Sequence, residues 1–190
     1  MRIQDRIGMP LDEFIRRYDD APFELIDGEI VPKMPTVSGH NKIAKRVFMA
    51  FLPFEQQGLG EVFQEAAYIH TERPDWVSGS RIPDVMWVAA AKLAEFRETV
   101  PDADRRPFIF VPDIVVEVVS TANTPADIQR GVATYLRHGV SLIWVIYPET
   151  RQVAVYRHDS QQLALLSGDD ALDASSVLPG FTLALKDIFG

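Results

Sequence analysis

The chain has 190 residues, of which 47% are hydrophobic, and a formal net charge of −8. This size and apolar content suit one domain with its own core, over residues 1–190. Because it has no cysteine, disulfides, zinc–thiolate sites and cysteine nucleophiles are excluded. The negative charge argues against non-specific coating of nucleic acid. No segment resembles a signal peptide or a membrane span, so we expect a soluble, cytoplasmic protein without a membrane partner.

Local patterns predict the elements of the first half of the chain. Residues 10–18 have the apolar spacing of a helix, and Phe23–Val31 predicts a β-hairpin whose two-residue turn is Asp27-Gly28. A loop at Pro35–Gly39 precedes a helix over His40–Gln57. The remaining predictions are a strand over 61–69, a loop over 71–80, a strand over 81–88, a helix over 89–96 and a charged loop over 97–107.

The second half contains the stretch that organises the prediction. Residues 112–120 are almost entirely apolar and β-branched, which is typical of a strand buried on both faces. A helix over 125–138 follows, with proline at its first position and Asp127 in its first turn. Further strands are predicted over 141–147, 152–157 and 163–166, and the tail to Phe189 ends in a short strand and one helical turn. These elements predict one α/β domain.

Two carboxylates interrupt the apolar strands and are the first candidates for chemistry. Glu117 lies late in the 112–120 strand, and Asp84 stands at the start of the strand that follows Pro83. A buried carboxylate requires a cation, a metal or a proton. If the two acids converge, they form a hard-oxygen site suited to Mg²⁺ or Mn²⁺. The alternative, that Asp84 caps a turn and Glu117 pairs with a core arginine, is equally compatible with the composition.

Glu24 and His40 are weaker candidates when judged by pattern alone. Glu24 lies on the first strand of the predicted hairpin, where a side chain can equally well face solvent. At about 100° per residue, His40 falls on the buried side of its helix. A histidine in that position is more often structural than catalytic.

Several motifs, in this order, resemble the Uma-two family of candidate restriction endonucleases in the PD-(D/E)XK nuclease superfamily. They are Phe-Glu-Leu-Ile-Asp-Gly-Glu-Ile at 23–30, Gly39-His40, Pro83-Asp84-Val85, the 112–120 strand, Tyr135 with Gly139-Val140, Trp144-Val145 and Leu178-Pro179-Gly180-Phe181. The resemblance implies a restriction-endonuclease-like core, which is a mixed sheet flanked by helices.

The same resemblance implies a function. Asp84 and Glu117 would bind a divalent metal, Mg²⁺ or Mn²⁺, with the backbone carbonyl of Val118 as a further ligand. Glu24 and His40 fall on family motif positions near that site, and we include both among the candidate catalytic residues. The implied reaction is metal-activated hydrolysis of DNA phosphodiester bonds. A homodimer is the family expectation, since duplex cleavage usually needs two sites.

The chain departs from the family pattern because it lacks the expected lysine at both positions where one is found. The superfamily places a lysine two residues after the second acid, where this chain has Val119. The Uma-two family takes its lysine from the next helix, at the position of Gly131. The substitutes that sequence leaves open are Gln129, Arg130, Arg46 and Arg81. The chain is therefore interpreted as a metal-dependent endonuclease with slow or relocated chemistry. The alternatives are an inactive nuclease-fold module that binds nucleic acid or regulates, and a hydrolase of another phosphate ester.

Overall fold

Two sheets organise the chain, and each belongs to a separate unit of the computed structural model. Unit 1 comprises Met1–Pro35, Ala67–Ile82 and Ala94–Val111, and unit 2 comprises Thr36–Ala66, Pro83–Leu93 and Pro112–Gly190. The structure describes residues 7–33, 36–160 and 163–190, so Pro35 of the predicted loop lies outside the described residues. The α/β class with a mixed sheet and flanking helices is confirmed. One domain over 1–190 stays a prediction.

Unit 1 is built on a five-stranded antiparallel sheet. The turn between its second and third strands has positive φ at Asp27 (51°) and Gly28 (85°), as the predicted hairpin requires. The first helix packs Phe14 against Phe23, with ring centroids 5.0 Å apart. The elements are β1 Met9–Pro10, α1 Leu11–Asp20, β2 Phe23–Ile26, β3 Glu29–Pro32, β5 Tyr68–Arg73, β6 Trp76–Arg81 and a 3₁₀ turn at Ala103–Arg105.

Two predictions for residues 61–80 are wrong. The single strand over 61–69 is two strands, because β4 (Gly60–Gln64) ends where Glu65 adopts a φ of 50° and β5 begins at Tyr68. The loop over 71–80 is largely a hairpin of β5 and β6. Its register shifts beside Thr71, and such irregularity lets a strand accept Gly79.

Unit 2 is built on a six-stranded mixed sheet in the order β11-β10-β9-β8-β7-β4. Among the strands of this sheet that the structure describes, only β8 and β9 pair in parallel, and the helix between them makes the crossover. The strands beyond β4 are β7 Val85–Ala89, β8 Ile114–Val118, β9 Leu142–Tyr147, β10 Gln152–Arg157 and β11 Ala164–Leu166, with a separate pair β12 Ala171–Asp173 and β13 Thr182–Ala184.

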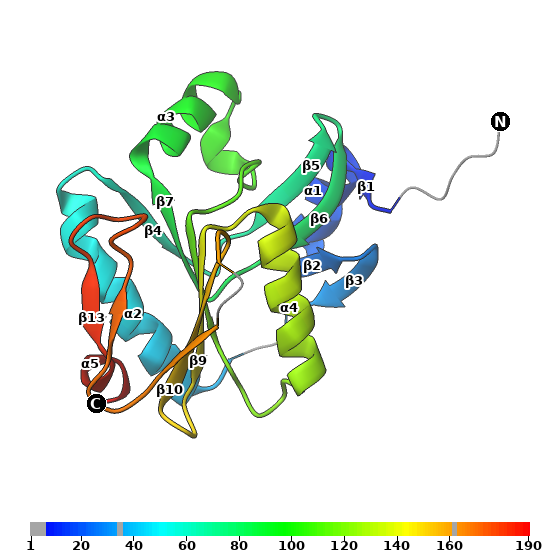
Figure 1. Cartoon of the computed structure of the whole chain (residues 1–190). Helices are drawn as coiled ribbons and strands as arrows, with labels where there is room; N and C mark the ends of the chain where they lie inside the picture. The colour runs from blue at the N-terminus through cyan, green and yellow to red at the C-terminus, as the bar shows by residue number, and fades with distance from the viewer. Residues whose placement is uncertain (1–6, 34–35, 161–162) are drawn as a thin grey trace. The chain divides into compact units, whose positions relative to one another are not determined.

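Helices cover both faces of this sheet. In Figure 1, α2 (Ser38–Gln56) and α4 (Pro125–His138) lie on opposite sides of it. The α2 side holds an apolar core, where Phe51 stacks on Trp87 and on Phe181. The short helix α5 (Leu185–Phe189) also belongs to unit 2, whereas α3 (Ala90–Thr99) begins in unit 2 and continues into unit 1 from Ala94. Within the described ranges, no helix is long and apolar enough to cross a membrane.

Candidate active site

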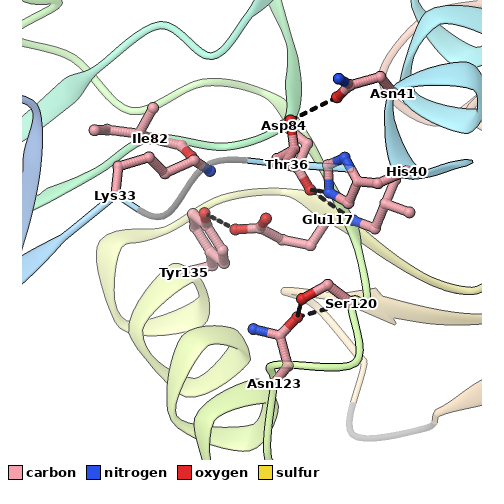
Figure 2. Close-up of polar contacts among 11 residues, drawn as sticks. Lys33, Thr36, His40, Asn41, Ile82, Asp84, Glu117, Ser120, Asn123 and Tyr135 are labelled. Carbon is pink, nitrogen blue, oxygen red and sulfur yellow. Dashed lines mark hydrogen bonds and ion pairs between the residues drawn. The ribbon is translucent and has the colours of Figure 1, made fainter. Parts of the chain in front are cut away.

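Glu117 points away from the main core of unit 2. Its neighbours in β8, Val116 and Val118, belong to the apolar core that α2 also lines. Side chains alternate between the two faces of a strand, so Glu117 points to the face that α4 covers. There the hydroxyl of Tyr135 donates a hydrogen bond to Glu117 Oε1 (Figure 2). Sequence reasoning missed this phenol as a partner of the carboxylate.

Asp84 occupies the place where β7 stops pairing with β8. The antiparallel ladder ends at Val85 opposite Val116, and Asp84 immediately precedes it in a bend outside the strand. Asp84 is only 3% exposed, and its Oδ2 accepts a hydrogen bond of 2.8 Å from the backbone N–H of Val118. The carboxylate thus takes the place of the carbonyl that a longer β7 would have offered to this buried N–H.

His40 completes the surroundings of Asp84. It lies in the first turn of α2, is 6% exposed, and its Nε2 is 2.9 Å from the same Oδ2. A protonated Nε2 donates to the carboxylate at that distance. The predicted position of His40 on the buried side of its helix is confirmed. The contact explains why a polar residue occupies this buried position, because the imidazole ring reaches the Asp84 carboxylate.

The backbone carbonyl of Val118 is directed to the same side as Asp84. In a strand the N–H and C=O of one residue point to the same neighbour. The N–H of Val118 points to Asp84, whereas the N–H of Val119 donates to the carbonyl of Ile146 on the β9 side. The structure therefore brings Asp84, Glu117 and Val118 to adjoining positions of unit 2, with His40 beside them.

The donors at these positions fit a hard divalent cation. Among the side chains that the structure describes, no group of three or more His, Asp or Glu is arranged to hold a metal. Mg²⁺ does not require such a cage, because it is usually bound by one or two carboxylates together with waters and substrate phosphate. The two carboxylates and one carbonyl match that donor set in type and number.

Glu24 belongs to unit 1, and its contacts there are structural in kind. Its Oε1 accepts a hydrogen bond of 2.8 Å from the N–H of Ile82 and lies 3.2 Å from Arg81 Nε. The two charged side chains are 12% and 9% exposed. Lys33 donates to the carbonyl of the same Ile82 at 2.9 Å. These contacts hold the end of β6, two residues before Asp84 in the sequence.

The position expected for the lysine is a buried glycine. Gly131 lies in α4 among the buried residues of that helix, one turn before Tyr135. The arginines considered as substitutes contact other groups: Arg130 pairs with Asp127, Arg46 donates to the carbonyl of Ile188, and Arg81 faces Glu24.

The start of α4 is held by a reciprocal cap. The Thr124 hydroxyl accepts from the N–H of Asp127, and the Asp127 carboxylate accepts from the hydroxyl and the N–H of Thr124. These hydrogen bonds, the one from the hydroxyl first, hold the pKa of Asp127 below its usual value. The helix that carries Gly131 and Tyr135 therefore begins at a defined residue.

Comparisons with known proteins agree on family and fold. The model of the Uma2 family, described as "Putative restriction endonuclease", matches residues 11–186. The fold is similar to the crystal structure of a protein described as "a putative nuclease" from Anabaena variabilis, with a TM-score of 0.77, 21% sequence identity, and coverage of 95% of this chain and 97% of that one. A search of curated proteins gave no match. The family match spans most of the sequence, and the chain therefore belongs to the Uma2 family.

Proposed function

We propose that this protein is a metal-dependent endonuclease that hydrolyses phosphodiester bonds of DNA. The observation that carries the proposal is the hydrogen bond that Asp84 Oδ2 accepts from the N–H of Val118, the residue next to Glu117. The carboxylates of both residues and the carbonyl of Val118 would hold Mg²⁺ or Mn²⁺. Membership of a family described as restriction endonucleases supports the same chemistry.

The protein groups of the site have separable tasks. A bound Mg²⁺ supplies Lewis acidity toward a phosphate oxygen and makes water more acidic. Asp84 and Glu117 contribute the negative charge that attracts the cation. His40 keeps the Asp84 carboxylate oriented through its contact with Oδ2. The N–H of Val118 holds the same oxygen, so the acid cannot turn away without losing both contacts.

The chain lacks the cation that this chemistry ordinarily uses. A lysine would stabilise the charge that develops on the phosphate in the transition state. With Val119 and Gly131 at the two positions where the superfamily and the family place it, we expect a slow enzyme. Loss of one such electrostatic group typically lowers the rate about 100- to 1,000-fold. Metal binding does not depend on it.

Gly131 also favours a second function. A nuclease fold that keeps its acids but lacks its lysine can act as a module that binds nucleic acid or regulates. The net charge of −8 agrees with a protein whose contact with nucleic acid is local. The two functions differ in one measurable property, because only the enzyme cleaves DNA.

A cleavage assay with single- and double-stranded DNA, in Mg²⁺ and in Mn²⁺, tests the proposal. Asp84→Ala and Glu117→Ala should each abolish metal-dependent cleavage. Asp113→Ala is the matched control, since it removes a carboxylate at the other end of β8 that accepts the N–H of Ala89 and pairs with Lys92. Cleavage that survives both site changes contradicts the proposal. A parent protein that binds DNA and never cleaves it supports the binding module.

A further inference from the structure

Tyr135 is a buried tyrosine whose polar atom is directed at the proposed metal site. Its side chain is 0% exposed, and its hydroxyl donates to Glu117 Oε1. A buried phenol requires a hydrogen-bond partner, and a bond to an ionised carboxylate is stronger than one between neutral groups. Here the acceptor is the one acid that interrupts the apolar β8.

Both partners of this hydrogen bond stand on rigid elements. Glu117 is in the parallel ladder, opposite Val145 of β9. Tyr135 is in the last part of α4, where Gly139 adopts a φ of 90° and its N–H donates to the carbonyls of Leu136 and Tyr135. The cap at Thr124 holds the other end of the helix. The Tyr135 hydroxyl is therefore positioned by a helix with defined ends and not by a loop.

The two acids are held by donors from opposite sides of the sheet. His40 from α2 contacts Asp84, and Tyr135 from α4 contacts Glu117 (Figure 2). A carboxylate has two oxygens and about four lone-pair sites, so the bond at Oε1 leaves Glu117 able to accept a cation. Hydrogen bonds of this kind set the orientation of metal-binding carboxylates.

We infer that Tyr135 is a positioning residue that presents the Glu117 carboxylate to the divalent cation. This inference rests on the proposed metal site and deepens it. The hydroxyl limits the conformers of Glu117, because rotation of the carboxylate away from Tyr135 would break the hydrogen bond at Oε1. The cation would then bind a Glu117 carboxylate that is already oriented. Tyr135 itself need not touch the cation or the DNA.

Calorimetric titration of the full-length protein with Mn²⁺ alone tests the inference. Tyr135→Phe removes one oxygen and should weaken Mn²⁺ binding about 10- to 100-fold. Two controls should bind Mn²⁺ like the parent. Tyr156→Phe removes a phenol from β10, and Val132→Ala loosens the buried face of α4 without removing a hydrogen bond. In a Glu117→Gln background, Tyr135→Phe should have no further effect.

The outcomes separate this inference from the proposed function. Parent protein that binds Mn²⁺, with Tyr135→Phe binding equally well, overturns the role of Tyr135 and leaves the metal site intact. Equal losses in Tyr135→Phe and Val132→Ala also overturn it, because they would show that general loosening of α4 is responsible. If the Tyr135→Phe protein fails to fold, the hydroxyl is needed for folding, and the inference is overturned. Parent protein that binds no Mn²⁺ overturns both the inference and the proposed metal site.

Discussion

Asp84 Oδ2 accepts the backbone N–H of Val118 at 2.8 Å, across the point where β7 and β8 separate. One carboxylate therefore has two tasks, since it satisfies a buried backbone donor and contributes charge to the proposed metal site. A substitution at this residue affects both tasks, and loss of activity alone would not distinguish them. Measuring stability and metal binding in the same variants separates the two tasks.

Asp84→Ala should lower the free energy of unfolding by about 1–3 kcal/mol, because it leaves the buried N–H of Val118 without this acceptor. Asp84→Asn should cost less, since an amide oxygen can accept the same hydrogen bond. Urea unfolding without metal measures both changes. Titration with Mn²⁺ should show weakened binding in both variants, because both lack the charge. An asparagine variant that binds Mn²⁺ like the parent would remove Asp84 from the metal site.

Glu24→Ala should lower the free energy of unfolding by about 3 kcal/mol, as breaking one side of a mostly buried ion pair does. The variant leaves Arg81 and the N–H of Ile82 without their contact to this carboxylate. Glu24→Gln is the matched control that keeps an acceptor for Ile82 and removes the charge. Urea unfolding gives the values. Unchanged stability together with lost cleavage would instead make Glu24 the catalytic residue that the sequence predicted.

Gly131→Lys should raise metal-dependent cleavage about 100-fold, because it returns a cation to the α4 face that carries Tyr135. Gly131→Met is the matched control, since it adds a side chain of similar length without charge. Single-turnover cleavage of the same DNA by the parent and both variants measures the effect. Equal rates in the lysine and methionine variants would show that position 131 does not supply a catalytic cation.

Asp127→Asn should flatten the dependence of stability on pH in the acid range. The folded-state pKa of Asp127 is lowered from 3.8, so the carboxylate stabilises the folded state above that value. This contribution is lost as the pH falls through the lowered folded-state pKa. Thermal unfolding of the parent and the variant from neutral pH down to the acid limit measures the difference. Parallel curves would mean that the cap carries no pH-dependent stability.

Sequence patterns determined those parts of the fold whose signals are local. The Asp27-Gly28 turn was predictable because two positive φ angles favour this residue pair in a hairpin. The helix over Pro125–His138 was predictable at both ends, from proline in its first turn and from Gly139 after its last. The motif order also indicated the family, which the family match confirms.

Tertiary structure decided the break after β4 and the β5–β6 hairpin. Residues 61–69 have one continuous tendency to form a strand, and only the positive φ at Glu65 divides them. Gly79 indicated a loop, although it lies inside β6. Strand pairing depends on partners distant in sequence, and such partners override local preference.

The same distinction holds for the candidate site. Sequence indicated which acids stand in apolar strands, because an unpaired buried carboxylate is costly. It could not indicate that Glu117 contacts Tyr135, 18 residues away, or that Asp84 contacts Val118, 34 residues away. The first contact depends on α4 covering one face of the parallel pair, and the second on where the β7–β8 ladder ends. Both are products of sheet register and helix packing, which only the folded chain defines.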